Sequence, residues 1–202
     1  AKIEVAGPGF LNIKLSKKSI IKNINLIFEN KELYGSNKTN ETYNIEFVSA
    51  NPTGPMHVGH CRGAIYGDVL ANLLLFNKNN VIKEYYINDY GNQIKNFVES
   101  VYLRIREIKF EEKFVLKENL YPGIYIKEIA QQILDKNKKV DFSELQKNYE
   151  FLKTKSLEES MNLIKHDLIK LGISHDNFFS ETELVNNDLV EKAVNKLREK
   201  SY

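Results

Sequence analysis

Apolar and polar residues alternate along residues 2–16, around a Gly-Pro-Gly turn at 7–9. Because alternation places every second side chain on one face of a strand, this stretch is predicted to form a hairpin-like pair of strands. From 19 to 28 the apolar positions recur with helical spacing, which predicts a helix. Residues 29–41 are mostly polar and rich in Lys and Asn, which indicates a linker at a domain boundary.

A strand, a helix, a second strand and a second helix follow in that order. An apolar run at 43–48 predicts the first strand, and the prolines and glycine of 49–55 exclude regular structure directly after it. Helical spacing returns between 64 and 76, a strand-like run covers 81–87, and another helical pattern covers 94–105. This alternation is typical of a parallel α/β unit with right-handed crossovers.

The rest of the chain has a mainly helical pattern. Residues 110–140 are less regular, and Ser143 with Gln146 three positions later indicates a capping box that opens a helix. An apolar stripe continues to Gly172, where this helix is predicted to end. A last helix at about 188–199 is predicted to bury its apolar face, which consists of Leu189, Val190, Ala193, Val194 and Leu197.

Composition and charge exclude few functions. The chain has 42% apolar residues, 28% charged residues and a net charge of +2, which neither requires nor excludes a nucleic-acid partner. Its single cysteine, Cys61, excludes an internal disulfide framework and a cysteine-rich zinc site. No apolar run is as long as a membrane span and no signal-peptide pattern is present, so we expect a cytoplasmic protein without membrane contact.

The segment at 49–60 carries the clearest candidate chemistry, because it lies between a predicted strand and a predicted helix, where open parallel sheets bind ligands. Gly59 leaves the helix start open to a close ligand, and the N-terminus of a helix favours phosphate. His57 and His60 are three positions apart, so both imidazoles lie on one face of the first turn and are candidates for hydrogen bonds to phosphate. Metal binding and helix capping are the alternatives, and no metal site is expected.

These residues resemble a known family. His57-Val58-Gly59-His60 is similar to the signature of class I aminoacyl-tRNA synthetases, and the longer string at 46–60 resembles arginyl-tRNA synthetases of the bacterial type. The similarity continues at 62–68 and 84–94, and more weakly at 6–10, 121–123 and 178–181. The implied fold is α/β: the first half of a Rossmann-like parallel-sheet catalytic domain with a largely helical insertion, preceded by a short β segment.

The resemblance implies an arginine side of the site, between the first strand and the signature helix. Ser49, Asn51 and His60 are expected to bind arginine, with Glu46 as a further contact. Taken by itself, Asn51 is also a good turn former before a proline, and Glu46 is equally compatible with a structural pairing.

On the other side, the resemblance implies that His57, Gly59 and His60 meet ATP and that His57 and His60 are catalytic. The implied reaction joins L-arginine to the α-phosphate of ATP with Mg²⁺ present and then transfers the arginyl group to tRNA(Arg). Members of this family resemble each other in needing tRNA for the first step. The parent protein is expected to be a monomer.

Other polar residues near the second strand have less certain assignments at this level. Asp89, Asn92 and Gln93 fit ligand contact and loop capping equally well. Of Tyr85 and Tyr86, one is expected in the core and the other on the surface.

The implied organisation is the tail of an additional N-terminal domain at 1–16, a helix and linker at 17–42, and the first half of the catalytic domain at 43–202, with the insertion at about 99–175. Gly54 stands where some family members carry a lysine and do without a later Lys-Met-Ser-Lys loop, a loop that this sequence does not contain. Both chain ends look like cuts through a longer protein, so we expect this piece alone not to charge tRNA. A different adenylate-forming nucleotidyltransferase and a non-catalytic tRNA-binding module are the alternatives.

Overall fold

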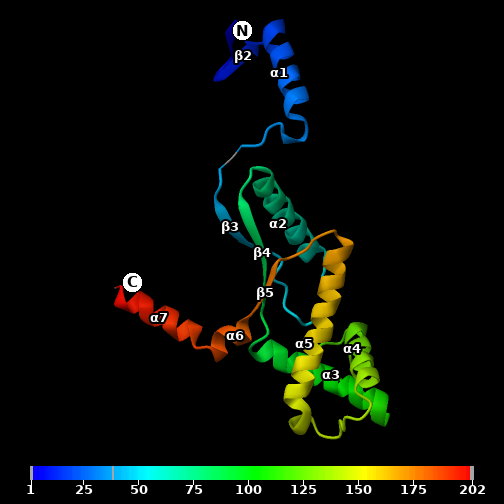
Figure 1. The fold of residues 1–202 in the computed structure, drawn as a ribbon. Helices are drawn as coiled ribbons and strands as arrows, with labels where there is room; N and C mark the ends of the chain where they lie inside the picture. Colours follow the sequence, from blue (N-terminus) through cyan, green and yellow to red (C-terminus); the bar gives the residue numbers. More distant parts are fainter. Residues whose placement is uncertain (1, 38, 201–202) are drawn as a thin grey trace.

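The computed structural model describes residues 2–37 and 39–200; the ends at 1 and 201–202 and position 38 lie outside the described residues. A small N-terminal group, a parallel sheet with its helices, and a C-terminal helical arm follow one another through the molecule (Figure 1). Within the described residues, no helix is both long and apolar enough to cross a membrane.

The N-terminal group confirms the predicted hairpin and helix. Strands β1 (Lys2–Ala6) and β2 (Phe10–Lys14) pair antiparallel. Helix α1 (Lys17–Asn30) begins after Ser16, whose hydroxyl accepts a hydrogen bond from the N–H of Ser19, and the 3-10 turn η1 (Lys31–Leu33) follows. The predicted linker at 29–41 thus begins with the end of α1 and with η1, and its described residues after Leu33 form neither helix nor strand.

The central sheet confirms the α/β fold class. Strands β3 (Thr42–Glu46), β4 (Asn80–Ile87) and β5 (Asn177–Ser180) are parallel and lie in the order β3-β4-β5. Helix α2 (Val58–Phe76) connects the first two, as the apolar spacing predicts. This order is that of one half of a doubly wound sheet, in which ligands bind at the carboxyl ends of the strands. Strand β5 was not predicted from the sequence.

Three helices are inserted between β4 and β5: α3 (Asn92–Phe110), α4 (Ile124–Lys136) and α5 (Leu145–Lys170). They enclose one core whose fully buried side chains include Phe97, Ile126, Phe142 and Leu152. The predicted capping box at Ser143 is wrong. Helix α5 begins two residues later without a side-chain cap, because the N–H and hydroxyl of Ser143 both donate to the carboxylate of Asp141.

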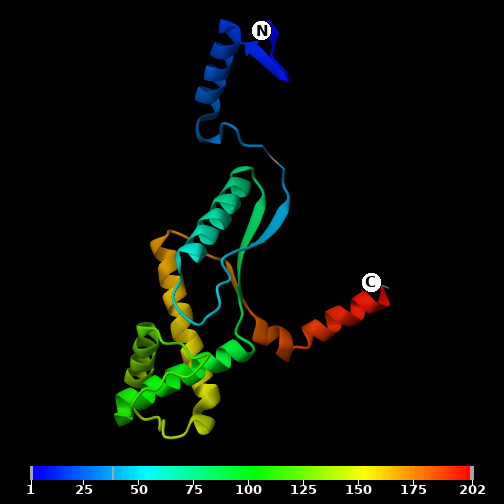
Figure 2. The same cartoon turned by 180° about the vertical axis from the view of Figure 1, so that it is seen from behind.

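The C-terminal arm consists of α6 (Glu181–Asn186) and α7 (Leu189–Glu199). The last helix forms as predicted, but its predicted burial is wrong, since none of its residues is buried. Figures 1 and 2 show the reason: α7 extends away from the sheet, and its main contacts among the described elements are with α6. The exposed apolar residues are Leu189, Val190, Ala193, Val194 and Leu197.

A second core supports the loop after β3. Phe47, Ala64, Tyr85, Met161, Ile164, Leu168 and Ile173 form this cluster, which therefore joins β4, α2 and α5. Helix α2 approaches Phe47 so closely that a Cβ atom at Gly67 would lie 2.3 Å from the phenyl ring. Glycine is required there for this packing.

Candidate functional site

The chain leaves β3 through a tight turn. Val48 has φ 70° and Ser49 has φ 41°, and the N–H of Ser49 donates to the carbonyl of Phe47, two residues back, at 3.0 Å. A β-branched residue with positive φ is strained by the contact of its Cβ with the backbone, at a cost on the order of 1–3 kcal/mol. Such strain persists only where surrounding contacts hold it, and this turn lies at the carboxyl end of a parallel strand.

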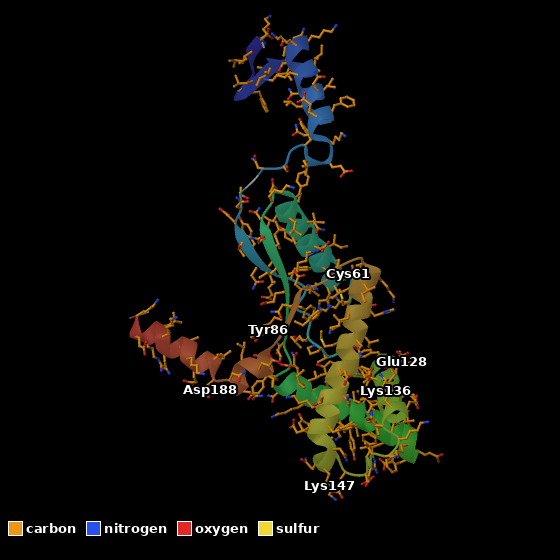
Figure 3. The ribbon with its side chains drawn as sticks, in the orientation of Figure 1. Cys61, Tyr86, Glu128, Lys136, Lys147 and Asp188 are labelled. Atoms are coloured by element: carbon orange, nitrogen blue, oxygen red, sulfur yellow. The ribbon has the colours of Figure 1, made fainter. Side chains whose placement is uncertain are left out.

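The turn brings Ser49 and Glu46 together. The Ser49 hydroxyl donates to Glu46 Oε1 at 2.5 Å and accepts from the N–H of Tyr86 on β4 at 3.0 Å. Figure 3 labels Tyr86 on the central strand. Two of the expected arginine contacts are therefore adjacent, with the Glu46 carboxylate exposed at the sheet end.

Two hydrogen bonds position Asn51, one to its own side chain and one to the backbone of the residue before it. Its Nδ2 donates to Oε1 of Gln93 in the first turn of α3 at 2.8 Å, which leaves its Oδ1 available to accept. The preceding residue, Ala50, is fixed by the sheet, since the buried Tyr85 hydroxyl donates to its carbonyl oxygen at 2.8 Å. Asn51 also takes part in a turn, because its carbonyl accepts from the N–H of Thr53.

The polar residues after β4 divide between the two assignments left open by the sequence. Gln93 faces Asn51, whereas Asp89 caps the start of α6 by accepting from the Ser180 hydroxyl and from the N–H of Thr182. Tyr85 is fully buried and Tyr86 is partly exposed, which confirms the expected division between core and surface.

His57 and His60 form a reciprocal cap at the start of α2. Nδ1 of His57 accepts from the N–H groups of Gly59 and His60 at 3.1 and 3.3 Å, and the N–H of His57 donates to Nδ1 of His60 at 3.4 Å. The two rings are stacked with centroids 3.6 Å apart. Because each Nδ1 accepts, the neutral rings carry their protons on Nε2.

This cap changes one expectation from the sequence. The first N–H groups of the helix are not left free for phosphate, because His57 itself occupies two of them. The imidazole Nε2–H groups are then the donors that the helix start presents. Burial, and secondarily the proximity of His57, lowers the pKa of His60 from 6.5, so this ring is neutral at pH 7.

A pocket of about 310 Å³ lies against this helix start. It is lined by loop residues between Asn51 and His57, by His60, and by Tyr125 from the first turn of α4. The Tyr125 ring covers Gly54, where an added Cβ would lie 2.8 Å from the ring. Sequence reasoning missed Tyr125; the available signal was its position two residues after the weakly similar segment at 121–123.

The described residues do not assemble a metal site of their own. No three His, Cys, Asp or Glu side chains among them lie close enough to share a metal ion. Cys61 follows His60 on α2 as a partly buried free thiol (Figure 3).

A parallel sheet, a strained turn at the end of its first strand, and a capped helix start beside a polar pocket define an α/β domain with a candidate ligand site at the carboxyl ends of its strands. A family profile for the catalytic domain of class I tRNA synthetases of the arginine type, "tRNA synthetases class I (R), catalytic domain", matches residues 23–202. The chain belongs to this family.

Curated relatives agree with this assignment. The arginine–tRNA ligase of Pelagibacter ubique is 52% identical over 98% of this chain, and that of Anaplasma phagocytophilum is 43% identical over 98%. The chain spans only 35% and 34% of the lengths of these two proteins.

Solved structures show the same fold. An arginyl-tRNA synthetase from Campylobacter jejuni superposes with a TM-score of 0.79 at 34% identity, over 92% of this chain and 40% of that one. The Thermus thermophilus arginyl-tRNA synthetase gives a TM-score of 0.59 at 18% identity, over 98% of this chain and 32% of that one. The second likeness concerns the fold alone.

Proposed function

We propose that this chain is the signature-bearing part of an arginine–tRNA ligase, which activates L-arginine with ATP and transfers it to tRNA(Arg). The observation that carries the proposal is the joining of two sets of side chains at one sheet end. Glu46, Ser49 and Asn51 lie after β3, and the capped histidine pair lies at the start of α2. We call the protein that unites this chain with the remaining length of its relatives the full-length ligase.

In this proposal the arginine side holds the amino acid by its polar groups. The carboxylate of Glu46 and the side-chain oxygen Oδ1 of Asn51 accept hydrogen bonds from the cationic groups of arginine. The hydroxyl of Ser49 keeps the Glu46 carboxylate in place. Asn51 and His60 both line the pocket that the proposal assigns to ATP. The arginine carboxylate is thereby directed towards the α-phosphate, and such alignment is worth roughly 7–11 kcal/mol in favourable cases.

The ATP side supplies hydrogen bonds to phosphate. The Nε2–H groups of His57 and His60 donate to phosphate oxygens, most strongly as negative charge builds up in the transition state. Gly59 packs directly under the His57 ring, where an added Cβ would lie 2.9 Å from the imidazole, so the proposal assigns it to keeping this ring in place beside ATP. Mg²⁺ belongs on the triphosphate of ATP in this scheme, because the described side chains offer it no cluster of ligands.

The proposal includes the division into an N-terminal tail at 1–16, a helix and linker at 17–42 and the catalytic half at 43–202. It also includes a monomeric, cytoplasmic full-length ligase and an inactive isolated chain. Within the part of the chain that the structure describes, the loop, the helix start and Tyr125 line the pocket, and the proposal assigns the remaining walls to the rest of the full-length ligase.

The test is ATP–pyrophosphate exchange by the full-length ligase with each of the amino acids, in the presence and absence of tRNA. Among the amino acids, we expect only arginine to support exchange. Exchange that another amino acid supports, or that needs no amino acid, would contradict the proposal. A charging assay with the isolated 202-residue chain beside it tests the second part, which fails if the chain charges tRNA at a rate near that of the full-length ligase.

A further inference from the structure

His175 lies in the segment between α5 and β5, distant in sequence from the signature loop. Its ring packs 4.2 Å from the ring of Phe47, with Tyr85 at 5.4 Å in an edge-on contact and Phe178 at 5.7 Å. Its Nε2 lies 3.3 Å from the carbonyl oxygen of Phe47. His175 thus contacts the residue from which the strained turn begins.

The carbonyl of Phe47 has two partners. It accepts from the N–H of Ser49 at 3.0 Å within the turn, and it faces Nε2 of His175 at 3.3 Å. A carbonyl oxygen has two lone pairs, so both bonds are made at once. His175 and Ser49 are therefore joined through a single atom.

The protonation state of the ring follows from its surroundings. Burial lowers the pKa of His175 from 6.5, the contact with the Phe47 carbonyl opposes this shift, and the nearby Lys83 lowers the pKa further while Asp68 and Asp176 raise it. The neutral ring carries one proton, and Nε2 carries it because Nε2 faces an acceptor. Nδ1 is buried and has no hydrogen-bond partner among the described residues.

The buried Nδ1 atom without a partner indicates that the His175 ring does more than fill space in the core. Packing among Phe47, Tyr85 and Phe178 would be served equally by a phenyl ring, which has no polar atom to desolvate. A buried nitrogen without a partner costs about 1–3 kcal/mol, so a purely packing role favours phenylalanine over histidine. The group that histidine adds is the Nε2–H donor to Phe47.

We propose that His175 is a positioning residue for the arginine side of the site: its Nε2–H fixes the Phe47 carbonyl and thereby holds the strained turn that places Ser49 and Asn51. This inference rests on the proposed function. It also assigns a task to the end of the inserted segment, because His175 follows α5, and residues of α5 pack in the same core as Phe47. The position of the insertion is thereby coupled to the position of Ser49.

Two substitutions in the full-length ligase separate the donor from the packing. His175→Phe keeps an aromatic ring in the cluster and removes the donor, whereas His175→Gln keeps an N–H donor near the place of Nε2. We expect His175→Phe to raise the arginine KM roughly 3- to 10-fold, the value of one hydrogen bond, with the ATP KM changed less than about twofold. His175→Gln should restore most of the arginine KM although it packs less well.

The outcomes are distinct. An unchanged arginine KM in His175→Phe, or equal rises in both KM values without rescue by Gln, overturns the inference. A wild-type ligase that shows no arginine-dependent exchange removes the proposed function instead, and the inference is then decided on this chain by NMR.

In the NMR experiment, His175 should carry its proton on Nε2. His175→Phe should speed amide hydrogen exchange at Ser49 and leave the amide of Val101, in the other core, unaffected. A proton on Nδ1, or equal protection of Ser49 in both proteins, contradicts the inference.

Discussion

His57 and His60 each fix the proton of the other. Nδ1 of His57 accepts from the N–H of His60 at 3.3 Å, and Nδ1 of His60 accepts from the N–H of His57 at 3.4 Å. In its neutral form each ring consequently carries its proton on Nε2. The cap and the proposed phosphate donors are the same two side chains, so the site is organised before any ligand arrives.

Replacing His60 by alanine in the full-length ligase should slow adenylate formation about 100-fold and change the ATP Kd only a few-fold. Loss of one donor to a developing oxyanion typically costs about 3 kcal/mol. Single-turnover kinetics with an independent nucleotide titration measures both quantities. His166→Ala, at an exposed histidine of α5, is the matched control and should leave both unchanged. An unaltered single-turnover rate in His60→Ala would show that His60 is not catalytic.

Replacing Asn51 by alanine should raise the arginine KM about tenfold at saturating ATP, since one hydrogen bond to a charged group is worth about 1.5 kcal/mol or more. Gln93→Ala should give a smaller rise, because it only frees the Asn51 amide from its partner. Exchange kinetics at varied arginine concentration measures both. If Asn51→Ala leaves the arginine KM unchanged, Asn51 is only a turn residue.

Two glycines of α2 should respond in opposite directions to alanine. Gly67→Ala places a Cβ 2.3 Å from the Phe47 ring and should destabilise the chain by about 1–3 kcal/mol, as overpacking does. At Gly63 nothing lies within 4 Å of the added Cβ, so Gly63→Ala should stabilise the helix by up to about 1 kcal/mol. Urea unfolding of the two variants provides the comparison, and equal effects would contradict the close contact between α2 and Phe47.

The unfolding free energy should fall as the pH is lowered through 6.5. Burial lowers the folded-state pKa values of His60 and His175 below this ordinary value, so in that window the unfolded chain binds more protons than the folded chain. The contribution of these two histidines to the unfolding free energy is fully present above pH 6.5, and it is lost as the pH falls towards their folded-state pKa values. Urea titrations at a series of pH values should show a shallower dependence in His175→Gln, and the same slope in both proteins would contradict the assignment to His175.

The order of strands and helices could be predicted because their patterns are local. Alternation gave the hairpin, and helical spacing gave α1, α2 and α3 within a few residues. Strand β5 is too short to show a period, and its pairing with β4 is set by residues more than ninety positions away. The burial of α7 failed because an amphipathic pattern shows which face is apolar but not whether a partner covers it.

Most of the candidate site that could be predicted lies in its loop, with Gln93 after β4 as a further candidate. The motif brought attention to Ser49, Asn51 and the two histidines, which are neighbours in sequence. Tyr125 and His175 reach the same loop from the insertion, and no local pattern marks them. The occupation of the helix N–H groups by His57 depends on its side-chain conformation, which spacing does not determine.

The shared carbonyl of Phe47 also sets an order of folding. Strands β3 and β4 and helix α2 can assemble from neighbouring parts of the chain, whereas the contact between Phe47 and His175 closes a loop of 128 residues. Closing a loop of that length costs conformational entropy, which the insertion reduces only after its own helices have packed. The turn that carries Ser49 should therefore reach its final shape late, after the insertion has folded and returned the chain to the sheet.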